Sequence, residues 1–304
     1  INAKAILFPQ SITDVQNIVL WARKNKLSLV PSGGRTGLSG AAIANQGEVV
    51  VSFEKMNRIL NFNELDQVVT LEAGVITESL QQFATQKNLY YPVDFAARGS
   101  SQIGGNIATN AGGIKVVRYG LTRDWVVGLK VVTGSGEILE LNKSLVKNAT
   151  GYDLRHLFIG SEGTLGFVVE AQIRLTNPPP PLQVLILGAQ ELNAIMQIFS
   201  QFKKACTLTA FEMFSEKALQ KVIASTGLSR PFTSEAQYYV LAEVEIKSEA
   251  DQNTALEVFE KCLEQGLVTD GAISQSESQA KNFWRLREDI SESLAKYSPY
   301  KNDI

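Results

Sequence analysis

Apolar residues recur along the first part of the chain with the spacing of a helix in some places and of strands in others. After residue 13 they recur at i, i+3, i+4 and i+7, on Val15, Ile18, Val19 and Ala22, which predicts an amphipathic helix. Thr13, followed three residues later by Gln16, predicts that a capping box begins this helix. Short apolar runs predict strands at 5–8, 27–30, 48–53, 67–72, 126–133, 137–141 and 167–173, with a second helix at 77–87.

Four consecutive prolines, Pro178–Pro181, interrupt this pattern, because a stiff polyproline segment continues neither a helix nor a central strand. Of the 23 glycines, 19 precede the run. After it we predict strands at 182–187, 207–213 and 237–246, and helices at 191–204, after the second strand, at 250–264 and at 276–296. This order resembles a split βαβ sandwich. We therefore expect an α+β protein with domains at residues 1–177 and 182–304.

Composition narrows the classes of function. With 44% hydrophobic and 20% charged residues the chain resembles an average globular protein, and its net charge of -2 favours neither nucleic acid nor an anionic membrane as a partner. There is no apolar run of 18 residues and no signal-peptide pattern, so we expect no transmembrane segment. Cys206 and Cys262 match no metal or redox spacing, which indicates free thiols in a reducing compartment. A cytoplasmic protein is expected, with peripheral membrane attachment and a homodimer left open.

Thirteen of the 23 glycines are concentrated in three segments. The first, residues 31–40, follows a predicted strand, and its glycines allow backbone N–H groups to form a nest suited to a pyrophosphate. The second, residues 92–113, consists largely of small and amide residues, which suits a backbone pressed against a flat ligand better than a packed core. The third, residues 148–166, leads into the strand predicted at 167–173.

The first and second segments each allow another interpretation. The first segment taken alone is also typical of a surface turn. A flexible linker is disfavoured for the second, because Ile103 and Ile107 anchor it four residues apart. Neither the Rossmann spacing nor the Lys-Ser/Thr end of a P-loop is present, which disfavours a nicotinamide or nucleoside-triphosphate enzyme.

Together, and in this order and spacing, the three segments resemble the FAD-binding domain of the vanillyl-alcohol oxidase (PCMH-type) flavoprotein family. Residues 103–113, 151–153 and 158–166 resemble its D-2-hydroxy acid branch, and the likeness extends over essentially all 304 residues. It implies a two-subdomain PCMH-type FAD-binding domain followed by a truncated, ferredoxin-like substrate (cap) domain. It also implies an FAD-dependent dehydrogenase that transfers a hydride from D-2-hydroxyglutarate, D-lactate or a glycolate-like acid to flavin N5, giving the 2-oxo acid.

The resemblance further implies the residues that bind FAD. Those expected at the pyrophosphate are Ser32, Gly33, Gly34, Arg35, Thr36, Gly37 and Leu38. Those expected along the isoalloxazine and ribityl region are Pro92, Val93, Asp94, Ser100, Gly104, Gly105, Asn106, Thr109, Asn110 and Gly113. Those expected at the adenine half are Glu162, Gly163 and Val168. Arg35 stands in the region where some members carry a flavin-tethering histidine, so FAD is expected to be non-covalent.

The last predicted helix carries the candidate substrate residues. Trp284, Arg287 and Ser291 lie at i, i+3 and i+7, hence on one face of a continuous helix. An arginine fork suits the carboxylate that every 2-hydroxy acid presents. Spacing alone equally allows Arg285 and Arg287 to pair with Glu288 and Asp289 on a solvated helix. The resemblance favours the first interpretation, because it implies that Arg287, Ser291 and Lys301 bind substrate carboxylates.

No catalytic base is expected within these residues. The single histidine, His156, is flanked by Leu154, Leu157, Phe158 and Ile159 and is interpreted as part of the core. The family's base and divalent-metal site would lie beyond Ile304, so no metal site is expected here, and the chain is expected to be part of a longer protein and inactive alone. Two alternatives stay open: an oxidase of another alcohol, and a flavin-binding fragment without catalysis. The electron acceptor is not predicted.

Overall fold

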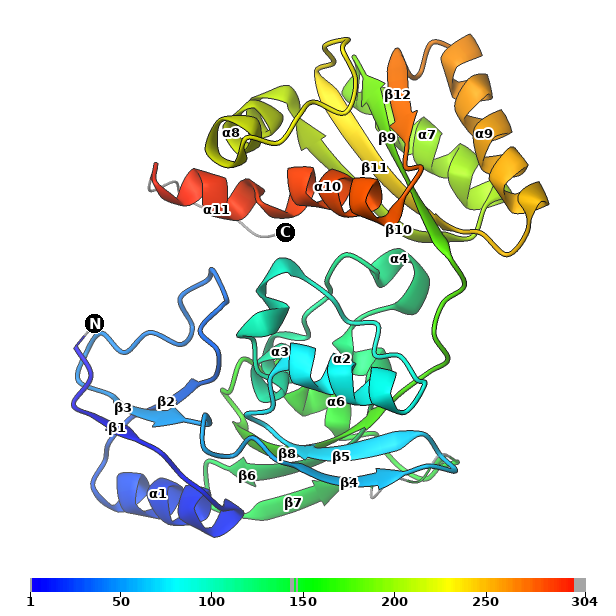
Figure 1. Ribbon diagram of the computed structural model, residues 1–304. Helices are drawn as coiled ribbons and strands as arrows, with labels where there is room; N and C mark the ends of the chain where they lie inside the picture. Colours follow the sequence, from blue (N-terminus) through cyan, green and yellow to red (C-terminus); the bar gives the residue numbers. More distant parts are fainter. Residues whose placement is uncertain (1, 143–144, 146, 298–304) are drawn as a thin grey trace. The chain divides into compact units, whose positions relative to one another are not determined.

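The computed structural model describes residues 2–142, 145 and 147–297, which divide into two compact units (Figure 1). The first unit contains the chain up to Gly113 and then Gly120–Pro178. The second contains Ile114–Tyr119 and continues from Pro179. Six residues that precede the proline run in sequence therefore pack as part of the second unit.

The first unit contains two sheets. The strands β1 (Ala5–Leu7), β3 (Val49–Ser52) and β2 (Leu29–Ser32) form a parallel sheet in that order. The second sheet is antiparallel, in the order β4 (Ile59–Asn63), β5 (Val68–Glu72), β8 (Gly166–Arg174), β6 (Val126–Thr133) and β7 (Ile138–Leu141). The predicted hairpin at 126–141 is confirmed. The edge strand β4 was not predicted, because Leu60, Asn61 and Asn63 are exposed and leave no apolar alternation.

Helices accompany both sheets of this unit. The helix α1 (Ile12–Lys24) buries Val15, Val19 and Ala22, as its periodicity predicts. In Figure 1, α2 (Thr77–Gln86) and α3 (Ile103–Thr109) lie on one side of the antiparallel sheet. Three shorter helices are η1 (Ala96–Gly99), α5 (Thr122–Trp125) and α6 (Arg155–Phe158).

The capping box predicted at Thr13 is wrong, because the helix begins one residue after Ser11. The Ser11 hydroxyl accepts a hydrogen bond from the Asp14 amide at 3.1 Å, and the Asp14 carboxylate accepts one from the Gln10 amide at 3.0 Å. Thr13 therefore lies inside α1. Hydrogen bonds from the Gln10 amide and from Ser11 hold the pKa of Asp14 below its ordinary value.

The second unit is a four-stranded antiparallel sheet covered by helices on both faces. Its strands lie in the order β10 (Leu208–Ser215), β11 (Tyr238–Glu245), β9 (Leu182–Ala189) and β12 (Asp270–Ile273). One face packs against α7 (Leu192–Ala205) and α9 (Glu249–Glu264), and the other against α8 (Glu216–Thr226) and α10 (Glu277–Glu288). The order is that of a split βαβ sandwich, which confirms the ferredoxin-like expectation.

The last predicted helix, by contrast, is two helices. The helix α10 ends at Glu288, and α11 (Ile290–Ala295) follows after Asp289, whose ψ of -1° departs from the helical value. Aspartate is a weak helix former, and the Asp289 carboxylate accepts a hydrogen bond from the Arg285 guanidinium at 3.1 Å. The face that Trp284 and Arg287 share on α10 therefore does not extend by helical spacing to Ser291 in α11.

Candidate functional site

The three glycine-rich segments meet within the first unit. The amides of Gly160 and Glu162 in the third segment donate to the carbonyls of Ile107 and Ala108 in α3, at 3.0 and 2.8 Å. A Cβ added at Gly34 of the first segment would overlap the Ser100 carbonyl of the second. At Gly34 any residue larger than glycine would collide with this neighbouring backbone, so the close approach of the two segments requires glycine there.

Two adjacent glycines of α3 face different surroundings. A Cβ added at Gly104 would lie 2.7 Å from the Cβ of Ala73, so Gly104 packs against the protein. A Cβ added at Gly105 would meet nothing within 4 Å. The Cα of Gly105 is the atom of α3 that lies nearest to the position a Cβ on Gly33 would occupy. The sequence did not predict α3. In the structure the second segment is partly a helix that presents bare backbone, rather than a loop throughout.

Two buried polar atoms beside these glycines lack a hydrogen-bond partner among the described residues. They are Oγ of Ser32, at the end of β2, and Oε1 of Gln102, one residue before α3. Leaving such atoms unpaired costs about 1–3 kcal/mol each, so native proteins usually supply a partner. The Ser32 hydroxyl can donate to a phosphate oxygen, and Gln102 Oε1 can accept from a ring N–H. FAD carries both groups, so the residues present fit it.

Each glycine-rich segment also contains one non-glycine residue with a left-handed backbone. Arg35, Asn110 and Glu162 have φ angles of 56°, 50° and 52°. Asn110 occupies this conformation at the end of α3, where its Oδ1 accepts a hydrogen bond from the Arg123 amide at 3.0 Å. Backbone conformations of this kind are uncommon outside glycine and gather at ligand sites.

The other expected cofactor residues lie in or beside the same three segments. Pro92, Val93, Asn106 and Val168 are buried, and the Asn106 amide donates to Thr77 Oγ1 at 2.7 Å. The Asp94 carboxylate accepts hydrogen bonds from Arg98 and Gln81, and a Cβ at Gly113 would overlap the Asp94 carbonyl. Gly163 approaches Pro31, with an added Cβ 2.5 Å from its Cγ. Partly or largely exposed are Thr36, Gly37, Leu38, Ser100 and Thr109.

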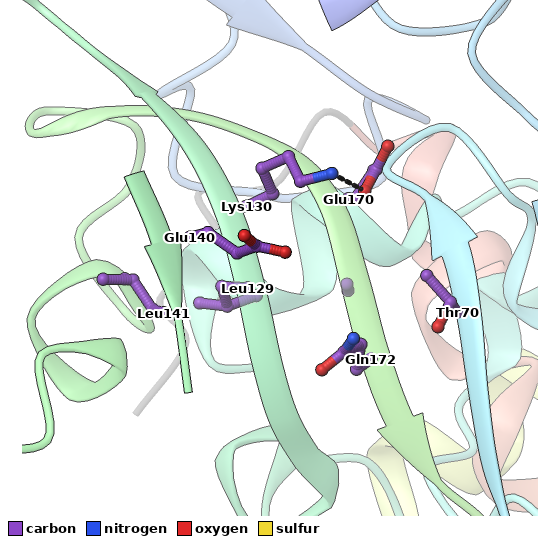
Figure 2. A pocket seen from close by; sticks show the side chains of 8 residues that line it. Thr70, Leu129, Lys130, Glu140, Leu141, Glu170 and Gln172 are labelled. Carbon is purple, nitrogen blue, oxygen red and sulfur yellow. Dashed lines mark ion pairs between the residues drawn. The ribbon is translucent and has the colours of Figure 1, made fainter. Parts of the chain in front are cut away.

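The antiparallel sheet of the first unit also carries a small hollow, which is too small to hold FAD. Figure 2 shows Lys130 reaching Glu170 there, at 2.6 Å between Nζ and Oε2. Its volume of about 20 Å³ holds roughly one water molecule. None of the residues expected to bind FAD lines it.

The interpretation of His156 as a core residue is wrong. Its side chain is 44% exposed and lies 3.5 Å from the Asp153 carboxylate. Leu154 and Leu157 are exposed as well, and only Phe158 and Ile159 are buried, because the four-residue helix α6 buries just one side of this run. The Arg155 guanidinium, which bonds to Asp153, holds the pKa of that carboxyl below its ordinary value.

Two classes of feature are not found among residues 2–142, 145 and 147–297. No helix there combines the length and apolar character needed to cross a membrane. No group of three or more histidine, cysteine, aspartate and glutamate side chains gathers there in a way that could hold a metal ion.

In the second unit, one end of a sheet face carries buried carboxylates instead of apolar side chains. Glu243 and Glu245 of β11 are 3% and 5% exposed. Glu243 pairs with Lys115, from the segment Ile114–Tyr119, and its other oxygen accepts from the Trp284 indole at 2.9 Å. Glu245 accepts from Arg118, from the helix α4 (Val116–Tyr119), at 2.9 Å, and this raises the pKa of Arg118. The inserted segment thus supplies the cations that these carboxylates need.

The candidate substrate arginine lies in the last turn of α10. Arg287 donates to Glu212 on β10 through Nε at 2.9 Å, with its NH2 2.7 Å from the same carboxylate oxygen. Pairing with a neighbouring acid on the helix is confirmed for Arg285, which contacts Asp289 at 3.1 Å, and is wrong for Arg287. Ser291 is an exposed residue of α11, and Lys301 lies outside the described residues.

Lys115, Glu212, Glu243 and Gln102 were not singled out from the sequence. A signal was available for one of these, Glu243: glutamates at alternate positions of the otherwise apolar strand Tyr238–Glu245 indicate carboxylates with buried partners. Lys115 carried no such signal, because its partner lies 128 residues away.

Known protein families match the part of the chain before the proline run and the part that follows its first residue. Residues 3–142 match the FAD binding domain family, and residues 179–304 match the C-terminal domain of FAD linked oxidases. The chain belongs to the FAD-linked oxidase family.

Curated relatives share much of this chain's sequence. A D-2-hydroxyglutarate dehydrogenase of Stutzerimonas stutzeri is 59% identical over 300 residues, covering 99% of this chain and 65% of the relative. One from Xanthomonas citri pv. viticola is 55% identical over 303 residues, covering 100% of this chain and 64% of the relative. The chain thus spans a little under two thirds of the length of these relatives.

Solved structures at lower identity show the same fold. An alkyldihydroxyacetonephosphate synthase has a TM-score of 0.73 at 19% identity, over 96% of this chain and 55% of that one. A p-cresol methylhydroxylase has a TM-score of 0.73 at 15% identity, over 93% of this chain and 60% of that one. The expected fold, a PCMH-type FAD-binding domain followed by an FAD-oxidase C-terminal domain, is confirmed.

Proposed function

We propose that this chain forms the FAD-binding part and a portion of the substrate-binding part of a dehydrogenase that oxidises a D-2-hydroxy acid to the 2-oxo acid. Family membership and the relatives named D-2-hydroxyglutarate dehydrogenase, at 59% and 55% identity, support this proposal and make D-2-hydroxyglutarate the first candidate substrate. The observation that carries it is the partly exposed guanidinium of Arg287, held by one oxygen of Glu212 in the oxidase C-terminal domain.

When bound, FAD supplies the hydride acceptor, and the residues of the first unit bind and orient it. Ser32 to Leu38 would hold the pyrophosphate, with the Ser32 hydroxyl as a donor to phosphate. Gly33 and Gly105 would allow close approach to the backbone, and Gln102 Oε1 would accept from a ring N–H. The remaining expected residues of the second and third segments would line the isoalloxazine, ribityl and adenine portions. No residue is assigned to a covalent tether.

In the second unit, Arg287, Ser291 and Lys301 would bind the substrate carboxylates. Arg287 is suited to this because its guanidinium is charged at every physiological pH and offers a planar pair of donors. Its contact with Glu212 shows that this fork already binds a carboxylate. D-Lactate and glycolate, with one carboxylate each, are the second choice of substrate.

The experiment is anaerobic reduction of the full-length, FAD-containing protein, followed by flavin absorbance. The compounds are D-2-hydroxyglutarate, its L-enantiomer, D-lactate, glycolate and the dimethyl ester of D-2-hydroxyglutarate. We expect reduction by the D-acid and little by the L-acid or the ester, which lacks the anionic groups that Arg287 requires. Equal reduction by the ester would overturn the role of Arg287 and indicate another alcohol as substrate. Retained FAD without reduction by any of these acids would indicate a flavin-binding protein of another function.

A further inference from the structure

The geometry points to Lys115 as a positioning residue for the substrate carboxylate: through Glu243 and Trp284 it fixes the turn of α10 that presents Arg287. This inference rests on the proposed function. Lys115 and Glu243 form a buried ion pair, and both also contact the side chain of Trp284.

Glu243 is the centre of this group. Its Oε1 accepts from Lys115 and from the Thr209 hydroxyl, and its Oε2 accepts from the Trp284 indole N–H at 2.9 Å. Lys115 and Glu243 are both buried, at 7% and 3% exposure. A carboxylate out of water is stable only when its charge is balanced and its oxygens are bonded, so loss of Lys115 leaves Glu243 without a counter-charge.

Trp284 is held from two sides by this pair. Besides the bond from its N–H to Glu243, the Lys115 ammonium lies 5.1 Å from the centre of its ring, within cation–π range. Trp284 precedes Arg287 by three residues and lies on the same side of α10, so its placement sets the rotation and height of the turn that carries Arg287.

The direct partner of Arg287 does not fix that turn by itself. Both contacts from the guanidinium go to a single oxygen of Glu212, and the Arg287 side chain is 34% exposed. One shared oxygen leaves the arginine free to pivot, whereas the buried group at Trp284 fixes the helix. The sheet thus holds α10 at two points one turn apart, through Glu243 on β11 and Glu212 on β10.

The same segment offers a matched control. Arg118 pairs with Glu245 as Lys115 does with Glu243, but its side chain is 43% exposed. Among the residues that the structure describes, neither member of this pair bonds to a residue of α10. A general loss of stability in the inserted segment should therefore follow from either change, and a displaced Arg287 from only one.

The test uses the full-length holoprotein with D-2-hydroxyglutarate as substrate. The variants are Lys115→Met, Lys115→Arg, Trp284→Phe and the control Arg118→Met, measured for KM, kcat, FAD per chain and Tm. We expect Lys115→Met and Trp284→Phe each to raise KM about ten-fold, the scale of one charged hydrogen bond, with kcat and FAD content little changed. Lys115→Arg should recover most of the affinity. Arg118→Met should change Tm without changing KM.

The double variant Lys115→Met/Trp284→Phe separates a shared path from two independent effects. Because both residues act through Glu243, its KM should be close to that of either single variant rather than their product. A KM for Lys115→Met equal to that of Arg118→Met would overturn the inference, as would multiplicative effects in the double variant. If Lys115→Met does not fold, Trp284→Phe decides, because it removes the bond and keeps the ring. Should Arg287→Ala also leave KM unchanged, the proposed function itself would be wrong.

Discussion

Gly105 presents bare backbone at the place where Gly33 comes closest to α3, with its Cα 3.9 Å from the position that a Cβ on Gly33 would occupy. Each of these glycines comes from a different segment, so the two segments form one surface. A flat ligand can approach the backbone at Gly105, because a Cβ added there would meet nothing within 4 Å.

Replacing Gly105 with alanine should therefore weaken FAD binding without disturbing the protein. The added methyl meets nothing within 4 Å in the protein itself, and alanine is a better helix former than glycine by about 0.5–1 kcal/mol. We expect less FAD per chain and an apoprotein of equal or higher Tm. The control is Gly134→Ala, in the β6–β7 turn, where an added Cβ also meets open space. Equal FAD content in the two variants would mean that Gly105 does not face the cofactor.

Arg287→Ala should raise KM for 2-hydroxy acids strongly while FAD content stays unchanged. Loss of a charged hydrogen-bond donor to a carboxylate costs about 1.5–3 kcal/mol, or roughly ten- to a hundred-fold in affinity. The control is Arg285→Ala, because Arg285 is 48% exposed and its ion pair is with Asp289 on its own helix end. The ratio of the two KM values is the measurement, and a ratio near one would contradict the assignment.

Much of the first unit could be predicted from sequence because its signals are local. Strand alternation, the 126–141 hairpin and the periodicity of α1 all depend on neighbouring residues. The order of the three glycine-rich segments indicated one ligand site, although not that seven residues of the second form α3. Glycine disfavours helices, and burial of Ile103 and Ile107 against the rest of the unit, together with hydrogen bonds from other segments, offsets this cost.

The candidate substrate residues were harder to predict because their partners are distant in sequence. Spacing placed Trp284 and Arg287 together on α10, but it gave no indication that Glu243 and Glu212 hold them from two strands. Nor could it reveal that Lys115, two residues after a glycine expected to contact FAD, belongs to the second unit. Such contacts are specified by the tertiary fold rather than by local pattern.

The two cysteines should react slowly with thiol reagents in the folded protein. Burial, with a smaller contribution from the Asp251 carboxylate, raises the pKa of the half-buried Cys206 thiol to about 11. Burial also raises the pKa of Cys262. Because the thiolate is the reactive form, little of either residue is reactive at neutral pH. Labelling with a chromogenic disulfide should be slow in buffer and complete in denaturant. Rapid labelling of Cys206 in the folded state would contradict the packing of α7.

Glu216 should contribute stability that disappears in acid. Burial alone would raise the pKa of this carboxyl, but hydrogen bonds from Arg230, Tyr239 and Gln220 outweigh burial and bring the pKa below its ordinary value of 4.5. Since the folded-state pKa is the lower one, the stabilisation is fully present above the unfolded-state pKa and is lost as pH falls through the folded-state value. Glu216→Gln should therefore lower the free energy of unfolding most near neutral pH, and its difference from the parent protein should shrink below about pH 4.5.

Urea unfolding of the parent and the variant at several pH values between neutrality and acid measures this difference. The matched control is Glu235→Gln, because the Glu235 carboxylate is 75% exposed and lies 3.7 Å from the same Arg230. An exposed pair of this kind contributes little, so the control should follow the parent at every pH. A pH-independent loss in Glu216→Gln would show that the side chain acts through packing at the start of α8, and not through the charge that Arg230 and Tyr239 stabilise.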